Sequence, residues 1–161
     1  MNLTGKNILI SGGGGYGVGG GICKALHEYG ARLIINEICE ERIEAVLKAY
    51  PDAIPVIADV SRYAEVEAMF HRLEKEVGII HGLVNNAGVG LSQSAHETSE
   101  AEFDDLYQVD IKGVWMMSKF FVKQLLQHQS GGNIVNISSV HAHATMSRYA
   151  VYGSAKSAVE G

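Results

Sequence analysis

The chain of 161 residues has few of the residues that mark secreted, disordered or membrane proteins: two cysteines, two prolines and one tryptophan. Cys23 and Cys39 fit no metal-binding or redox spacing, so we expect reduced thiols in a cytoplasmic protein. No apolar run is long enough to cross a bilayer, and the N-terminus lacks the layout of a signal peptide. The net charge of −5 disfavours nucleic acid and anionic membranes as partners.

The composition is that of an ordinary globular protein, with 47% hydrophobic and 19% charged residues. The length fits one domain that spans residues 1–161 and can bury a substantial core. There is no internal repeat and no linker rich in proline or serine.

Short apolar runs alternate with segments of helical periodicity along the chain. The apolar runs predict buried strands at residues 7–11, 32–36, 54–58, 82–85 and 133–137. The helical segments follow at residues 22–29, at 38–50, after a capping residue Ser61, from a capping box at 99–102 towards 129, and from about Tyr152. Strands that are each followed by a helix predict an α/β fold: a doubly wound, Rossmann-type parallel sheet with strand order 3-2-1-4-5.

The first predicted strand ends in a glycine-rich turn over residues 12–20, which leads into a helix. Glycine lets the backbone approach a pyrophosphate closely, and a helix N-terminus supplies free N–H groups for it. The acidic Glu37 ends the second strand, where a carboxylate can accept bonds from ribose hydroxyls and repel a 2′-phosphate. Arg42 lies a turn or more into the next helix, so we expect no arginine to offset this repulsion, and we predict NAD rather than NADP. The alternative is that Glu37 is an ordinary exposed glutamate at a helix start.

Tyr152 and Lys156 are four residues apart and therefore share one face of a helix. The lysine ammonium stabilises the phenolate, which lets the tyrosine exchange a proton. Ser139, at the end of the fifth predicted strand, can hold a substrate oxygen beside that phenol. A surface tyrosine and a surface lysine are the alternative interpretation of this pair taken alone.

Together these segments resemble the classical short-chain dehydrogenase/reductase family over nearly the whole chain. The turn at residues 10–19 resembles the family's TGxxxGxG motif, and residues 58–60 resemble its acidic position after the third strand. Residues 85–88 match NNAG, residues 136–139 match the strand that carries the catalytic serine, and Tyr152 with Lys156 matches YxxxK.

The resemblance implies an oxidoreductase that transfers a hydride between NAD(H) and a small secondary alcohol or ketone. It implies Tyr152 as general acid/base, Lys156 as the residue that activates it and holds the nicotinamide ribose, Ser139 on the substrate oxygen and Asp110 on the proton relay. The cofactor residues implied are Gly12, Gly13, Tyr16, Gly17, Val18, Gly19, Glu37, Asp59, Val60, Asn86, Ala87, Gly88, Tyr152 and Lys156. It also implies a homo-oligomer of the full-length form, through the helix that carries Trp115.

Three departures from the family pattern stand out. One residue more separates Gly12 from Gly17, which we expect to be absorbed as a bulge over residues 13–16, and Asp110 stands where the family has asparagine. The chain also stops at Gly161, whereas single α/β domains of this kind reach roughly 250 residues. We therefore expect a fragment or a natural truncation, and we expect the 161 residues alone to be inactive and prone to aggregate or to be only partly ordered after about Ser139.

Other functions stay open at this point. The departures motivate a catalytically inactive module that only binds the dinucleotide. A nucleotide-sugar epimerase or dehydratase of the extended branch is opposed by NNAG and by the short chain. His141 and His143 form an H-x-H that can ligate a metal, but no third ligand is evident nearby, so we predict no metal.

Overall fold

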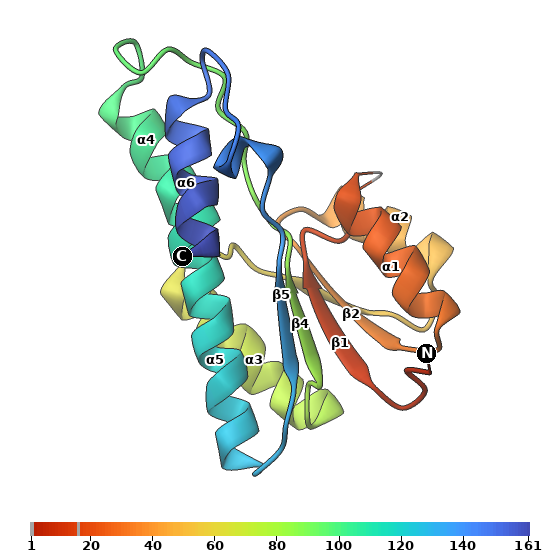
Figure 1. The fold of residues 1–161 in the computed structure, drawn as a ribbon. Helices are drawn as coiled ribbons and strands as arrows, with labels where there is room; N and C mark the ends of the chain where they lie inside the picture. Colours follow the sequence, from red (N-terminus) through yellow and green to blue (C-terminus); the bar gives the residue numbers. More distant parts are fainter. Residues whose placement is uncertain (1, 16) are drawn as a thin grey trace.

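Five short strands run parallel in the order β3-β2-β1-β4-β5, which confirms the predicted topology (Figure 1). The strands are β1 Asn7–Ser11, β2 Arg32–Glu37, β3 Ile54–Ile57, β4 Gly82–Asn85 and β5 Asn133–Asn136. This computed structural model of the protein describes residues 2–15 and 17–161. Each predicted strand is found within one residue of its expected bounds.

The helices cover both faces of this sheet. They are α1 Val18–Glu28, α2 Glu40–Ala49, α3 Tyr63–Val77, α4 Glu100–Tyr107, the π-helical η1 Gln108–Gly113, α5 Val114–Gln127, the 3₁₀ turn η2 Val140–Ala142 and α6 Ala150–Glu160. In Figure 1, α1 and α2 lie on one side of the sheet, and α3, α4, α5 and α6 lie on the other. The sheet is therefore doubly wound, as predicted.

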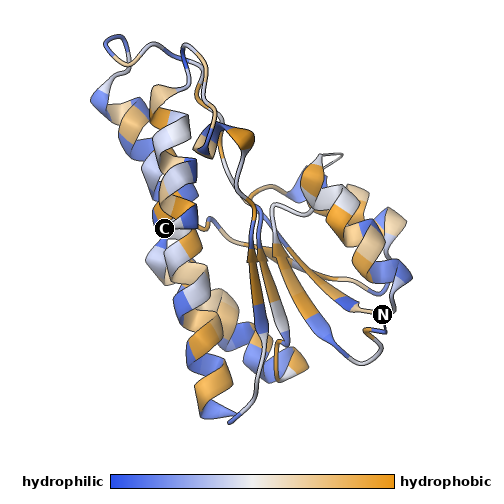
Figure 2. Cartoon of the chain, viewed as in Figure 1, coloured by the Kyte–Doolittle hydropathy of each residue, from blue (hydrophilic) through white to orange (hydrophobic). Residues whose placement is uncertain are grey.

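Alternate residues of the strands build one core on each face of the sheet. On β1, Leu9 packs with the cluster that includes α3 and α5, whereas Ile8 and Ile10 pack with the cluster that includes Cys23 of α1. Apolar residues follow the strands in Figure 2 because both faces of these strands are buried. The two edge strands are the exception, since Ile57 of β3 is 49% exposed, and on β5 Ile134 is 37% and Val135 is 52% exposed.

The helix ends are partly as expected. The capping box is confirmed, since Glu102 N–H donates to the hydroxyl oxygen of Ser99 and the Glu102 carboxylate accepts from Ser99 N–H. The cap expected at Ser61 is wrong: α3 begins at Tyr63, with Arg62 as a cap residue whose side chain makes no capping bond. The reason is local, because Ser61 N–H donates to Asp59 Oδ1 at 2.8 Å and closes a turn ahead of the helix.

The helices near the glycine turn and after Ser99 also differ from expectation. α1 begins at Val18 rather than at residue 22, so the glycines at positions 19–21 belong to the helix. The long stretch after Ser99 ends at Gln127 instead of 129 and is interrupted by η1. Within the described ranges, no helix has both the length and the apolar character needed to span a membrane.

Candidate active site

The sheet order reverses between β1 and β4, and the loops after these strands part at this point. Open α/β sheets bind their ligands at such a switch point. Two cavities of about 330 Å³ and 320 Å³ lie along this edge, and Asn86, Gly88 and Val89 line both. A ligand longer than either cavity can therefore extend through both.

The loop ends of β1 and β4 are joined by hydrogen bonds through Ser11 and Asn86. The Ser11 hydroxyl accepts the backbone N–H groups of Asn86 and Ala87, both at 3.1 Å. The Asn86 side-chain amide donates to the carbonyl oxygens of Ser11 at 3.1 Å and Gly12 at 2.8 Å. Serine, where the resembled family usually has threonine, thus supplies the hydroxyl that fixes this corner.

Gly12 passes so close to the β4 loop that only glycine fits there. Its φ is +64°, and a Cβ atom would lie 2.9 Å from the Cα of Ala87. Both the left-handed backbone and the close approach exclude a side chain. This brings the glycine turn directly against the lining of the first cavity.

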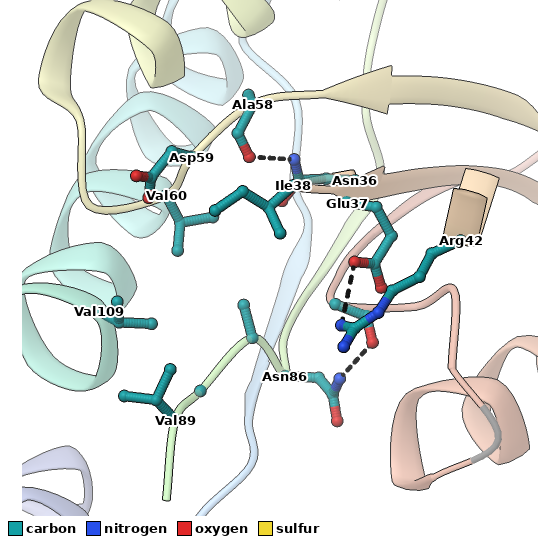
Figure 3. Close-up of a pocket in the computed structure, with 13 residues that line it drawn as sticks. Asn36, Glu37, Ile38, Arg42, Ala58, Asp59, Val60, Asn86, Val89 and Val109 are labelled. Atoms are coloured by element: carbon teal, nitrogen blue, oxygen red, sulfur yellow. Dashed lines mark hydrogen bonds and ion pairs between the residues drawn. The ribbon is translucent and has the colours of Figure 1, made fainter. Parts of the chain in front are cut away.

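Glu37 ends β2 inside the first cavity and is already held by two partners (Figure 3). Its carboxylate accepts the Gly14 N–H at 2.7 Å, and the Arg42 guanidinium lies 3.5 Å from its other oxygen. Glu37 is only 3% exposed, so it is not a free glutamate at a helix start. The expectation that no arginine lies near Glu37 is wrong, because the first turn of α2 brings Arg42 back over the end of β2.

The rest of the first cavity comes from the ends of β2, β3 and β4. Asn36 donates its side-chain amide to the Ala58 carbonyl at 2.9 Å and so fixes the ends of β2 and β3 to each other. Asp59 and Val60 line the cavity directly after β3 (Figure 3). The Asp59 carboxylate is turned to its own loop, where it accepts Ser61 N–H and lies 3.7 Å from the Arg62 guanidinium.

The predicted cofactor residues divide between the two cavities. The first is lined by Gly12, Glu37, Asp59, Val60, Asn86, Ala87 and Gly88, and the second by Val18, Asn86, Gly88, Tyr152 and Lys156. Gly13, Gly17 and Gly19 line neither cavity but form the turn and the first turn of α1 beside them. Tyr16 lies outside the described residues, and so does one end of the expected bulge.

The second cavity brings together all four predicted catalytic residues: Ser139, Tyr152, Lys156 and Asp110. They come from three elements, because Ser139 precedes η2, Asp110 lies in η1, and the tyrosine and lysine lie one turn apart on α6. The Lys156 ammonium lies 5.7 Å from the centre of the Tyr152 ring. Ser139 accepts the His141 N–H at 3.3 Å, which leaves its own O–H to donate to a ligand.

Asp110 and Lys156 form a buried ion pair at the back of this cavity. Lys156 Nζ lies 3.0 Å from Asp110 Oδ2, and the side chains are 8% and 0% exposed. The other carboxylate oxygen accepts the Val89 N–H at 2.8 Å. Lys156 also donates to the Ile137 carbonyl at 3.4 Å. The aspartate therefore contacts the lysine directly.

The segment after Ser139 contains contacts that sequence analysis missed. The His141 ring stacks on Tyr149 with centroids 4.4 Å apart and meets Tyr152 edge-on at 5.7 Å. His143 instead pairs with Glu160 at 2.8 Å. Thus the two histidines diverge, and no cluster of three metal-ligating side chains occurs among the described residues.

Glu160 ties the end of α6 to the end of β5, and no motif signals this role. Ser138, beside the predicted catalytic serine, donates its hydroxyl to the Glu160 carboxylate at 2.6 Å. The one sequence signal is spacing: Glu160 follows Lys156 by four residues, as Lys156 follows Tyr152, so all three lie on the same side of α6. The contact fixes the strand end from which Ser139 projects.

These features fit an extended phosphate-bearing nucleotide with a reactive group at one end. The first cavity offers a carboxylate for ribose hydroxyls and is lined by Gly12 of the glycine turn, while Val18, the first residue of α1, lines the second cavity. The second offers a phenol, an ammonium and a serine hydroxyl around one space. Such a set can donate or accept a proton at an oxygen held by the serine.

Comparison with known proteins gives consistent matches. Residues 6–161 match the sequence profile of the short chain dehydrogenase family. The chain is 33% identical to 5-keto-D-gluconate 5-reductase of Escherichia coli (strain K12), over 99% of this chain and 64% of that protein. It is 30% identical to L-xylulose reductase of Homo sapiens, over 98% of this chain and 63% of that protein.

A solved structure is similar over the same part of the fold. The gluconate 5-dehydrogenase from Burkholderia cenocepacia J2315, in complex with NADP and tartrate, superposes with a TM-score of 0.91 at 29% identity. The match covers 98% of this chain and 63% of that one. The chain thus spans slightly less than two thirds of the length of these relatives.

Proposed function

The chain belongs to the short-chain dehydrogenase family. On that premise we propose that it acts as an NAD-dependent oxidoreductase on a small secondary alcohol or the matching ketone. The observation that carries the proposal is the second cavity, where Ser139, Tyr152 and Lys156 meet beside the nucleotide cavity. Its lining shares Asn86, Gly88 and Val89 with that cavity, so a nucleotide and a substrate can touch there.

The residues of the second cavity divide the chemistry between them. A bound nicotinamide nucleotide supplies the hydride chemistry. The Tyr152 hydroxyl gives its proton to the carbonyl oxygen in reduction and takes it back from the alcohol in oxidation. Ser139 holds the same oxygen by a hydrogen bond, and Lys156 binds the ribose and stabilises the phenolate less than an unpaired lysine would, because Asp110 lies against it. Asp110 positions the lysine through their 3.0 Å contact.

The preference for NAD rests on Glu37. Its buried carboxylate faces the space where an adenosine ribose fits, and a 2′-phosphate there meets a like charge. Arg42 lines the same cavity and weakens this exclusion, because its guanidinium can turn from Glu37 to a phosphate. We therefore propose a preference for NAD with measurable acceptance of NADP.

The test is turnover with a panel of secondary alcohols and ketones, using protein that includes whatever sequence the source gene encodes after Gly161. Tyr152→Phe is expected to remove nearly all turnover and leave nucleotide affinity unchanged, because the ring remains while the exchangeable proton is lost. The matched control is Tyr29→Phe, at a tyrosine that is 48% exposed on the far end of α1 and lines neither cavity.

Two results would contradict the proposal. Substantial turnover in Tyr152→Phe would mean that another group moves the proton. Tight nucleotide binding without turnover of any substrate by the unaltered protein would instead favour the inactive nucleotide-binding module.

A further inference from the structure

We propose that the ion pair between Asp110 and Lys156 keeps Tyr152 protonated at neutral pH, so that the site is set for carbonyl reduction and oxidises alcohols only in alkaline solution. This inference rests on the proposed function and names its working direction. The step balances: the carbonyl carbon would accept a hydride from a reduced nicotinamide nucleotide, which would thereby be oxidised, and the carbonyl oxygen would accept the proton of Tyr152. The C=O π bond is replaced by C–H and O–H bonds, and the phenolate then takes a proton from water.

The geometry of the pair favours a charge interaction over a relay through water. The ammonium and the carboxylate are 3.0 Å apart, but Asp110 Oδ2 accepts no well-aligned hydrogen bond. Attraction between opposite charges does not need that alignment, so the pair holds without it. Gly88 closes the space, since a Cβ atom there would lie 3.2 Å from Asp110 Oδ2 and 3.3 Å from Lys156 Nζ.

The position of Asp110 determines the net charge that acts on the Tyr152 phenol. The ammonium lies 3.0 Å from the carboxylate but 5.7 Å from the centre of the phenol ring. A lysine alone favours the phenolate. A lysine that contacts a carboxylate forms a pair with no net charge, and this pair has little effect on a phenol at the distance of the Tyr152 ring. Asparagine at position 110 leaves the lysine charge uncompensated, which is why this departure from the family pattern matters.

Other charged groups near the pair are few and have their own partners. On α6 and the segment before it, Glu160 binds His143 and Ser138, and Arg148 donates to the Ser92 carbonyl. Lys112 of η1 donates to Gln108, and the α4 acids Glu100, Glu102, Asp104 and Asp105 are exposed. Among the described groups that can titrate, the rings in contact with Tyr152 are those of His141 and Tyr149.

The test measures the ionisation of Tyr152 directly and needs no turnover. The ultraviolet titration curve of Tyr152→Phe is subtracted from that of the unaltered protein. The difference reports the ionisation of Tyr152 alone, without the other six of the seven tyrosines. In an Asp110→Asn background, the same difference is expected to show a tyrosinate midpoint lower by about one pH unit or more. This corresponds to about tenfold more phenolate at a given pH below the midpoint.

Asp105→Asn removes an equal charge from the exposed face of α4 and is expected to leave the midpoint in place. An unchanged or higher midpoint in Asp110→Asn would overturn the proposal. Should that variant fail to fold, the unaltered protein still decides: a Tyr152 midpoint below about pH 8, against about 10 for free tyrosine, also overturns it. The titration does not depend on turnover. A protein that shows the expected midpoints but turns over no substrate would therefore contradict the proposed function and not this inference.

Discussion

At the scale of single residues, Glu37 and Arg42 are expected to determine the affinity of the nucleotide cavity for a nucleotide with a 2′-phosphate. Glu37→Gln removes the negative charge, while its amide oxygen can still accept the Gly14 N–H. We expect the ratio of NADP to NAD affinity to rise about tenfold or more, as calorimetric titration with both nucleotides would measure.

The matched variant acts in the opposite direction. Arg42→Ala leaves the Glu37 carboxylate without its cationic partner, so NADP affinity is expected to fall while NAD affinity changes little. If the affinity ratio stays the same in both variants, these two side chains do not contact the nucleotide at its 2′ position.

The two cysteines are expected to differ in reactivity. Burial and the nearby Glu37 carboxylate raise the pKa of Cys23 from 9.0 to about 11, and its side chain is 0% exposed. Since the thiolate is the reactive form, native protein at pH 8 should be alkylated at the half-buried Cys39, and at Cys23 only after unfolding. Mass spectrometry of the labelled peptides checks this. Equal labelling of both in the native state would contradict the buried position of Cys23.

The same thiol makes stability depend on pH in the alkaline range. Its folded-state pKa lies above the ordinary value, so the folded protein binds the proton more tightly. Its contribution to stability is therefore complete below about pH 9 and is lost as the pH rises towards 11.

At the scale of elements, the start of α4 and the start of α3 make a matched pair of serines. Ser99→Ala removes the capping box and is expected to lower the free energy of unfolding by about 1 kcal/mol. Ser61→Ala is expected to change it little, because no side-chain bond caps α3. Urea denaturation of both variants compares them. A larger loss in Ser61→Ala would mean that Ser61 caps α3 in solution.

The Ser99 cap also depends on acid. Hydrogen bonds from Ser99 lower the pKa of Glu102 below its ordinary value of 4.5. The stabilisation is thus present above that value and fades as the pH falls through the lowered one. The difference between the unaltered protein and Ser99→Ala should accordingly shrink in acid.

Periodicity and turn residues predicted the strands and their order well, because each strand is a buried apolar run next to glycine or to a polar loop. They failed where a polar side chain had a choice of partner. Ser61 fits a helix cap by type, but Asp59 two residues earlier accepts its N–H. The π-helical segment η1 could not be predicted from the sequence, because the helical periodicity of the flanking segments does not reveal one extra residue between them.

The site was predicted to a similar extent. Motif residues that follow strand ends come together because parallel strands end at one edge, which placed Glu37 and Asn86 on the first cavity and Asn86 and Ser139 on the second. Side-chain pairs across that edge could not be predicted. Arg42 returning to Glu37 and Glu160 reaching Ser138 depend on helix directions that only the packed structure fixes.

At the scale of the whole molecule, β5 gives the described part of the fold an open flank. The strand pairs with β4 on one side, and Ile134 and Val135 are partly exposed on its two faces. A polypeptide of residues 1–161 made alone should therefore self-associate, since unpaired strand edges and exposed apolar surface both favour contact with other chains.

Val135→Lys is expected to shift this polypeptide towards monomer, as size-exclusion chromatography at several concentrations would show. Leu126→Lys is the comparison, because Leu126 is 74% exposed on α5. A shift with Leu126→Lys alone would assign the association to α5.

The helical segments α4, η1 and α5 form one continuous rod from residue 100 to residue 127, which passes the site and continues along the sheet (Figure 1). η1 holds Asp110 towards Lys156 in the middle of this rod. As a π-helical segment, η1 holds one residue more than an α-helix of the same extent, so a deletion of one residue within 108–113 would let the segment become α-helical and leave α4 and α5 in line. Asp110→Asn changes only a charge, but such a deletion would change the direction in which the side chain at position 110 leaves the rod and so break its 3.0 Å contact with Lys156. The length of this segment is thus constrained as strictly as its chemistry, and homologous chains with the same site should show insertions and deletions elsewhere.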